Sequence, residues 1–222
     1  MAVKLGNGNW AVKEDKLLAY NDNSGRFFNK EFDFDRGSSA TYVGKDGLIK
    51  SAASDVPRID FSDSTNGALL LEGQSTNLVN YSQDFSDSSW VKSISTITPN
   101  TSISPDGTLN ADTLVISSNG YLLKTITYSG VSGQSITSSV FAKNEITNFL
   151  RFGGATIAGT DAYSIQDYGS GWFKHILTRT FTSTATGSIQ YIIFNEIGSN
   201  IIWGAQLEQG SYATSYIPSL SG

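Results

Sequence analysis

The stretch Asn200-Ile-Ile-Trp-Gly-Ala-Gln-Leu-Glu208 decides the fold class, because its side chains alternate in character along an extended chain. One face of such a strand carries Ile201, Trp203, Ala205 and Leu207. The other face carries Ile202, Gly204, Gln206 and Glu208. We expect a β-strand whose first face lies against a core.

Similar short segments recur along residues 81–222 at intervals of roughly ten to twenty residues, the spacing of a β-sandwich. The expected strands are 112–117, 121–128, 135–143, 149–152, 171–182, 188–195 and 200–207. Asn119-Gly120 between the first two predicts a hairpin turn, since both residues tolerate positive φ. No segment has sustained helical periodicity, although 82–90 could hold a helical turn.

Residues 1–80 differ in composition, because they carry 20 charged side chains while the 142 residues that follow carry 15. Strands are expected at 17–20 and 27–34. Hairpins are expected across Asp46-Gly47, between 40–43 and 48–51, and across Asn66-Gly67, between 58–61 and 68–71. We therefore predict a smaller β-rich N-terminal region, 1–76, that serves docking or assembly, and a larger β-sandwich, 77–222.

Composition excludes several functions. The net charge of −5 and the pI near 4.8 argue against nucleic acid as a partner. Cysteine is absent and His175 is the single histidine, so thiolate metal sites and zinc sites with two imidazoles are excluded. The N-terminal residues lack the apolar core of a signal peptide, and we expect neither secretory export nor membrane insertion.

Three side chains offer limited chemistry. Alternation places His175 beside Phe173, Leu177 and Phe181, which favours a hydrogen-bonded structural histidine over a catalytic base. Asp33 and Asp35 share one strand face and could hold a cation or act as a glycosidase pair. Their neighbours Lys30 and Arg36 favour a solvated ion-pair face instead.

Aromatic residues make up 12% of the chain, more than one core of this size needs. Four of them lie in or beside segments rich in Gly, Ser and Asp, where aromatic rings can stack on sugars and polar groups can bind hydroxyls. These candidate carbohydrate-binding residues are Trp90, Tyr163, Tyr168 and Trp172. The alternative for each is a place in the core or in an interface between subunits.

Seven segments together resemble a family of tailed-phage virion appendage proteins, the head spike fibre and tail fibre proteins. They are Lys4-Leu-Gly-Asn-Gly-Asn-Trp10, Leu17-Leu-Ala-Tyr-Asn21, Phe34-Asp-Arg-Gly-Ser-Ser-Ala-Thr41, Lys45-Asp-Gly-Leu-Ile49, Pro57-Arg-Ile-Asp-Phe61, Leu69-Leu-Leu-Glu-Gly-Gln-Ser-Thr-Asn-Leu78 and Tyr81-Ser-Gln-Asp-Phe-Ser-Asp-Ser-Ser-Trp90. The resemblance implies assembly in a host cytoplasm and a place on the virion surface, as a capsid decoration or tail appendage. It also implies contacts with other virion proteins and a homo-oligomer, most often a trimer.

Residues 77–222 are similar to jelly-roll carbohydrate-binding modules. The segments that carry this likeness are Asn77-Leu-Val-Asn-Tyr-Ser-Gln-Asp-Phe85 with Trp90, Ser139-Val-Phe-Ala-Lys143, and Ile202-Trp-Gly-Ala-Gln-Leu-Glu-Gln-Gly210. Such modules often hold a structural calcium between their first and last strands. Here Gln206 and Glu208 stand at the corresponding place, and only Glu208 is a good ligand for calcium.

These observations give three hypotheses. The first is a non-enzymatic structural protein of a bacteriophage particle that presents a jelly roll for host attachment. The second makes binding of a host-surface glycan its main activity. The third is a glycan depolymerase with Asp33, Asp35 or Glu208 as the acids.

Overall fold

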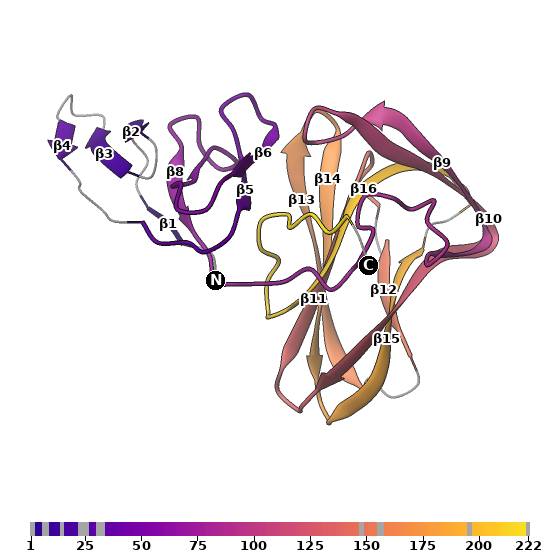
Figure 1. Cartoon of the computed structure of the whole chain (residues 1–222). Coiled ribbons are helices and arrows are strands. Elements are labelled where there is room, and N and C mark those ends of the chain that lie inside the picture. The colour runs from indigo at the N-terminus through magenta and orange to yellow at the C-terminus, as the bar shows by residue number, and fades with distance from the viewer. Residues whose placement is uncertain are drawn as a thin grey trace. The chain divides into compact units, whose positions relative to one another are not determined.

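The computed structural model describes residues 3–5, 9–13, 16–21, 27–29, 34–146, 149–154, 158–194 and 197–220. The chain divides into two compact units (Figure 1). Unit 1 comprises Met1–Gln74 and Thr214–Ile217, and unit 2 comprises Ser75–Ala213 and Pro218–Gly222. From the sequence we expected a single boundary after residue 76. In the structure, unit 1 also includes the short segment Thr214–Ile217. Within the described residues, no helix has the length and apolar character needed to span a membrane.

Unit 1 is built from three small antiparallel sheets. Its strands are β1 (Val3–Leu5), β2 (Asn9–Lys13), β3 (Lys16–Asn21), β4 (Phe27–Asn29), β5 (Ala40–Val43), β6 (Ile49–Ala52), β7 (Ile59–Asp60) and β8 (Ala68–Leu71). Both predicted hairpins form: β5 pairs with β6, and β7 with β8. Gly47 and Gly67 supply the expected positive φ, at 78° and 70°.

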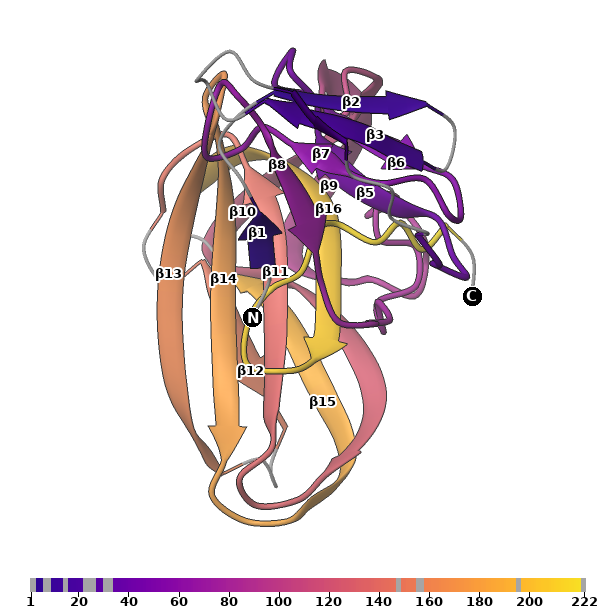
Figure 2. The same cartoon turned by 90° about the vertical axis from the view of Figure 1, so that its left-hand side faces the viewer.

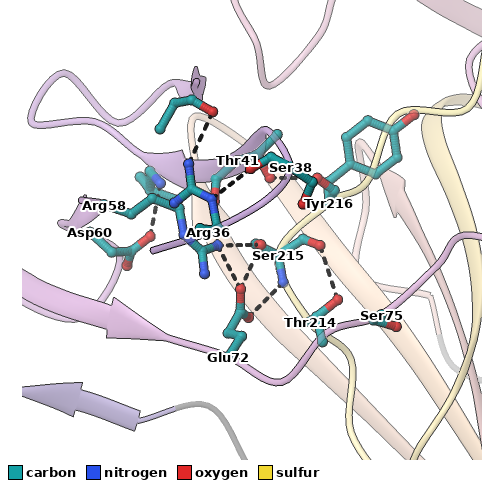
Figure 3. Close-up of polar contacts among 12 residues, drawn as sticks. Arg36, Ser38, Thr41, Arg58, Asp60, Glu72, Ser75, Thr214, Ser215 and Tyr216 are labelled. Carbon is teal, nitrogen blue, oxygen red and sulfur yellow. Dashed lines mark hydrogen bonds and ion pairs between the residues drawn. The ribbon is translucent and has the colours of Figure 1, made fainter. Parts of the chain in front are cut away.

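A buried polar network ties the segment Thr214–Ile217 into unit 1 (Figure 3). Arg58 Nη1 donates to Glu72 Oε2 at 2.7 Å and to Ser215 Oγ at 2.9 Å. Ser215 in turn donates to both carboxylate oxygens of Glu72, and Thr41 Oγ1 donates to the carbonyl of Tyr216. The charged groups of this ion pair therefore lie out of water, but each has hydrogen-bond partners.

Unit 2 holds the remaining strands, which form one continuous antiparallel sheet in the order β12-β15-β10-β16-β11-β14-β13, with β9 added along β10. The strands are β9 (Val91–Ile103), β10 (Leu109–Gly130), β11 (Ser135–Ala142), β12 (Leu150–Gly153), β13 (Gly159–Gly169), β14 (Trp172–Phe181), β15 (Ala185–Phe194) and β16 (Gly198–Gln209). Figure 2 shows β13, β14, β11 and β16 side by side. β9 and β13 were not among the strands expected from the sequence.

This sheet folds over into two layers around an apolar core. Tyr191 of β15 reaches across the core, and its hydroxyl donates to the carbonyl of Ser139 on β11 at 2.7 Å, although the two strands are not sheet neighbours. From β11 the chain passes to β12 and returns to β13 and β14. It then passes to β15 and returns to β16, the winding of a jelly roll. The predicted fold class is confirmed: an all-β jelly-roll sandwich preceded by a smaller β-rich region.

The predicted hairpin at Asn119-Gly120 is wrong, because β10 runs through these residues without turning back. The first half of β10 pairs with β16 and the second half with β15, so this strand turns the corner between the layers. The register against β9 shifts between Ile116 and Tyr121, and Ser118 adopts a φ of 44°. The residues that suggested a reversal instead form an irregular bend within one strand.

The predicted faces of β16 are right only after Gly204. Gly204 has a φ of 66° and the register against β11 shifts beside it, which marks a β-bulge. The extra residue reverses the alternation, so Ile202 joins the core together with Ala205 and Leu207, while Trp203 packs against Phe141. The strict period of two could not reveal this switch.

Candidate functional site

A pocket of about 370 Å³ opens at one place on unit 2. The loop that precedes β9 contributes Tyr81, Gln83, Asp84 and Ser86 to its lining. Pro99 and Asn100 come from β9, Asn110 and Asp112 from β10, and Leu220 from the C-terminal part of the unit. This volume falls within the range of ~300–1,000 Å³ that is usual for small-molecule sites.

Asp112 forms the floor of the pocket and is 1% exposed. Its carboxylate accepts hydrogen bonds from the backbone N–H of Asn100 at 2.9 Å and of Phe85 at 3.1 Å. It thus joins the loop and β9 to β10. Burial raises the pKa of Asp112, the two backbone donors lower it, and the nearby Asp84 carboxylate raises it further.

Asp84 lies at the exposed rim, where its Oδ1 organises the loop. This oxygen accepts from the backbone N–H of Ser86 at 3.0 Å and of Asp87 at 3.2 Å, and from the hydroxyl of Ser86 at 2.6 Å. Within the described residues, the hydrogen bonds that Asp84 accepts go to Oδ1.

The amide side chains supply further polar atoms. Asn100 has a φ of 55°, a left-handed conformation that Asn tolerates better than most residues. Asn110 Nδ2 donates weakly to Asp106 at 3.4 Å, but Asn110 Oδ1 is buried and has no hydrogen-bond partner within the described residues. A buried acceptor without a donor is energetically unfavourable, so this oxygen favours a ligand that supplies a hydrogen-bond donor.

Tyr81 lines the pocket, and Lys124 lies beside its ring. The ammonium of Lys124 lies 5.2 Å from the centroid of Tyr81 and 5.4 Å from that of Trp90, and it donates to the hydroxyl of Ser89. Trp90 Nε1 donates to the carbonyl of Tyr81 at 3.1 Å. Burial lowers the pKa of Lys124, Asp87 raises it and Lys92 lowers it. The loop 81–90 is therefore fixed on both sides of the tyrosine.

The predicted stacking residues lie elsewhere, and two of them are buried. Trp90 is 1% exposed and packs on Phe85 and Tyr191, with centroids 5.0 and 5.9 Å away. Trp172 is 4% exposed, and Lys143 Nζ lies 5.5 Å from its ring centroid. Rings buried to this extent offer no face to a sugar, so Trp90 contributes only by supporting the pocket loop.

Tyr163 and Tyr168 are both on β13, and only partly exposed. The Tyr163 hydroxyl lies 2.7 Å from Nδ1 of His175 and donates to the carbonyl of Ile146, and burial raises the pKa of Tyr163 to about 12. The other imidazole nitrogen of His175 lies 2.9 Å from the carbonyl of Asn144. The predicted structural histidine is thus confirmed. Tyr168 packs edge-on against Phe141, with centroids 4.9 Å apart.

Glu208 does not fit the calcium site that its position suggested. The side chain is 1% exposed, and its two carboxylate oxygens accept from Ser75 Oγ at 2.6 Å and from Gln206 Nε2 at 2.7 Å. Across the part of the chain that is described, no three His, Cys, Asp or Glu side chains gather as a metal site would need. Calcium takes six to eight oxygen ligands, whereas side-chain donors satisfy this carboxylate.

Of the proposed acid pair, Asp33 lies outside the described residues, and Asp35 is exposed in unit 1. Sequence reasoning missed the pocket residues Tyr81, Asp84 and Asp112. One available signal was Asp112 itself, a carboxylate on the same strand face as the buried Leu114 and Ile116, where burial requires local hydrogen-bond donors.

Comparison with known proteins gives little information on the role of this pocket. A scan of protein-family models and a search of curated proteins gave no match. One solved structure, from a study of the promiscuous specificity of carbohydrate-binding modules of the β-sandwich superfamily, is similar with a TM-score of 0.30 and 11% identity, covering 93% of this chain and 96% of that chain. A likeness at this level carries no argument about function.

Proposed function

We propose that this protein is a non-catalytic carbohydrate-binding protein that uses the pocket of unit 2. The pocket carries this proposal, because it combines one aromatic wall, Tyr81, with amide and carboxylate side chains that can bind sugar hydroxyls. Both oxygens of Asp112 already hold backbone amides, as suits a fixed binding surface rather than a group that must exchange protons.

The test is titration calorimetry against a panel of bacterial surface oligosaccharides, with two tyrosine variants. Tyr81→Ala removes the pocket wall and is expected to weaken binding about tenfold or more. Tyr168→Ala removes the partly exposed ring of β13 and is expected to leave affinity unchanged. The reverse pattern would move the site to β13, and binding to no member of the panel would count against the proposal.

We further propose that the protein is carried on a bacteriophage particle as a capsid decoration or tail appendage, where the sugar it binds belongs to the host surface. The support is the resemblance of segments between Lys4 and Trp90 to virion appendage proteins. Cryo-electron microscopy of purified particles tests this directly. Density for this chain in a symmetric, trimeric position is expected, and its absence from particles would reject the proposal.

A further inference from the structure

The two charged side chains that line the pocket are both acidic. Asp84 and Asp112 contribute two carboxylates, and the other lining residues, Tyr81, Gln83, Ser86, Pro99, Asn100, Asn110 and Leu220, contribute no basic side chain. Such a lining attracts cations and repels anions, more strongly in a concave site than on an open surface.

Two lysines contact the loop that lines the pocket. Lys92 Nζ donates to the carbonyls of Ser86 and Asp87, at 2.8 and 2.6 Å, and Lys124 is enclosed by Tyr81 and Trp90. The Asp84 carboxylate contributes to the raised pKa of Asp112, after burial. Both carboxylates line the pocket, and among its described lining residues no basic side chain accompanies them.

Independent of charge, the pocket has acceptors that lack donors. In the part of the chain that the structure describes, Asn110 Oδ1 is buried without a hydrogen-bond partner, and the hydrogen bonds to Asp84 go to Oδ1 rather than Oδ2. A ligand group with several N–H donors and a positive charge satisfies both, and charge-assisted hydrogen bonds are about twice as strong as neutral ones.

We propose that the pocket selects sugars with a free, protonated amine over their N-acetylated forms and excludes sugars with carboxylates. This inference rests on the proposed function and names the ligand class of the same site. N-acetylation removes the positive charge and two of the three N–H donors, while a uronic acid adds a third negative charge beside Asp84 and Asp112.

The experiment is calorimetric titration at about pH 6 with four probes of equal length: tetramers of glucosamine, N-acetylglucosamine, glucose and galacturonic acid. The glucosamine tetramer is expected to bind about fivefold more tightly than the N-acetylated one, the scale of a partly exposed charge pair. The galacturonic acid tetramer is expected not to bind. Raised salt is expected to weaken only the glucosamine complex.

Asp84→Asn is the matched variant, because an amide oxygen can still accept from Ser86 N–H. It is expected to abolish the preference for the amine while leaving the melting temperature unchanged. Asp167→Asn is its control, since Asp167 Oδ1 likewise accepts from the backbone N–H of Gly169 at 2.7 Å but lies outside the pocket. The preference should persist in this control.

Equal or tighter binding of the N-acetylated tetramer would overturn this inference and leave the proposed function standing. Failure of all four tetramers to bind, together with failure of the wider oligosaccharide panel, would remove both. Binding that disappears when EDTA is added would assign the two carboxylates to a cation instead, and would also overturn the inference.

Discussion

Ser215 and Glu72 are 143 residues apart in the sequence, yet two hydrogen bonds join them: Ser215 N–H to Glu72 Oε1 at 2.8 Å and Ser215 Oγ to Glu72 Oε2 at 2.7 Å. Glu72 also pairs with Arg58, and both side chains are almost fully buried. Unit 1 is therefore completed by the segment Thr214–Ile217, which lies far along the chain from the rest of the unit, and its buried ion pair contacts this segment.

Replacing Glu72 with alanine is expected to lower the free energy of unfolding by about 3–5 kcal/mol, because Arg58 would keep a buried charge without a partner. Urea denaturation measures the loss. The control is Asp46→Ala, which removes an ion pair to Lys50 whose side chains are about half exposed, at 48% and 46%. That control should leave the unfolding midpoint unchanged, and an equal effect of both variants would contradict the argument.

Two truncations separate the role of the C-terminal segment in unit 1 from its role in unit 2. A chain ending at residue 213 loses Ser215 and is expected to show faster hydrogen exchange in β5 to β8, since Glu72 and Arg58 lose their donor and acceptor. A chain ending at residue 217 retains the network and is expected to protect these strands normally. Equal protection in both chains would show that the network is dispensable.

The hairpins of unit 1 could be predicted from sequence because their signals are local. Gly47 and Gly67 each lie in a tight turn, and a positive φ there depends on few other residues. The same reasoning failed at Asn119-Gly120, where the pairing of β10 with β9, β16 and β15 overrode the local turn propensity. The reversal of faces at Gly204 also depends on pairing with β11 that one strand's pattern does not contain.

The candidate site was harder to predict than the fold for a similar reason. Aromatic content and a neighbouring segment rich in Ser and Asp singled out Trp90, among others, whereas the structure buries that ring and places Tyr81 at the pocket. Asp112 comes from a strand and Asp84 from a loop 28 residues earlier, and only the folded chain brings them together. Composition therefore does not locate the site.

Gly120→Ala is expected to be strongly destabilising, by about 1–3 kcal/mol. A Cβ at this position would lie 2.3 Å from the carbonyl oxygen of Ile94 and 2.7 Å from that of Ser93, both backbone atoms of β9. The control is Gly37→Ala, since a Cβ there meets no atom within 4 Å. Thermal denaturation distinguishes the two, and a tolerated Gly120→Ala would contradict the close approach of β9 and β10.

The pH dependence of stability is expected to report on His175. Burial lowers the pKa of this imidazole in the folded chain, outweighing the opposing effects of its backbone contacts and of Glu145. The unfolded chain takes up a proton near pH 6.5, so below that pH the unfolded state binds more protons than the folded state. The free energy of unfolding therefore falls as the pH drops below about 6.5, by up to about 1.4 kcal/mol per pH unit.

Asp112 cannot cause this decrease in the free energy of unfolding. Its pKa is raised in the folded chain, so the folded state takes up a proton at a higher pH than the unfolded state does. Protonation of Asp112 therefore favours the folded state as the pH drops. Aspartates with lowered pKa values, such as Asp106, lose their contribution to the stability of the folded state only as the pH falls toward about 4 and below. Since His175 is the single histidine of the chain, the variant His175→Gln is expected to flatten the stability profile between about pH 5 and 6.5. Urea midpoints at a series of pH values measure the slope, and an unchanged slope in the variant would show that His175 is already protonated in the folded chain.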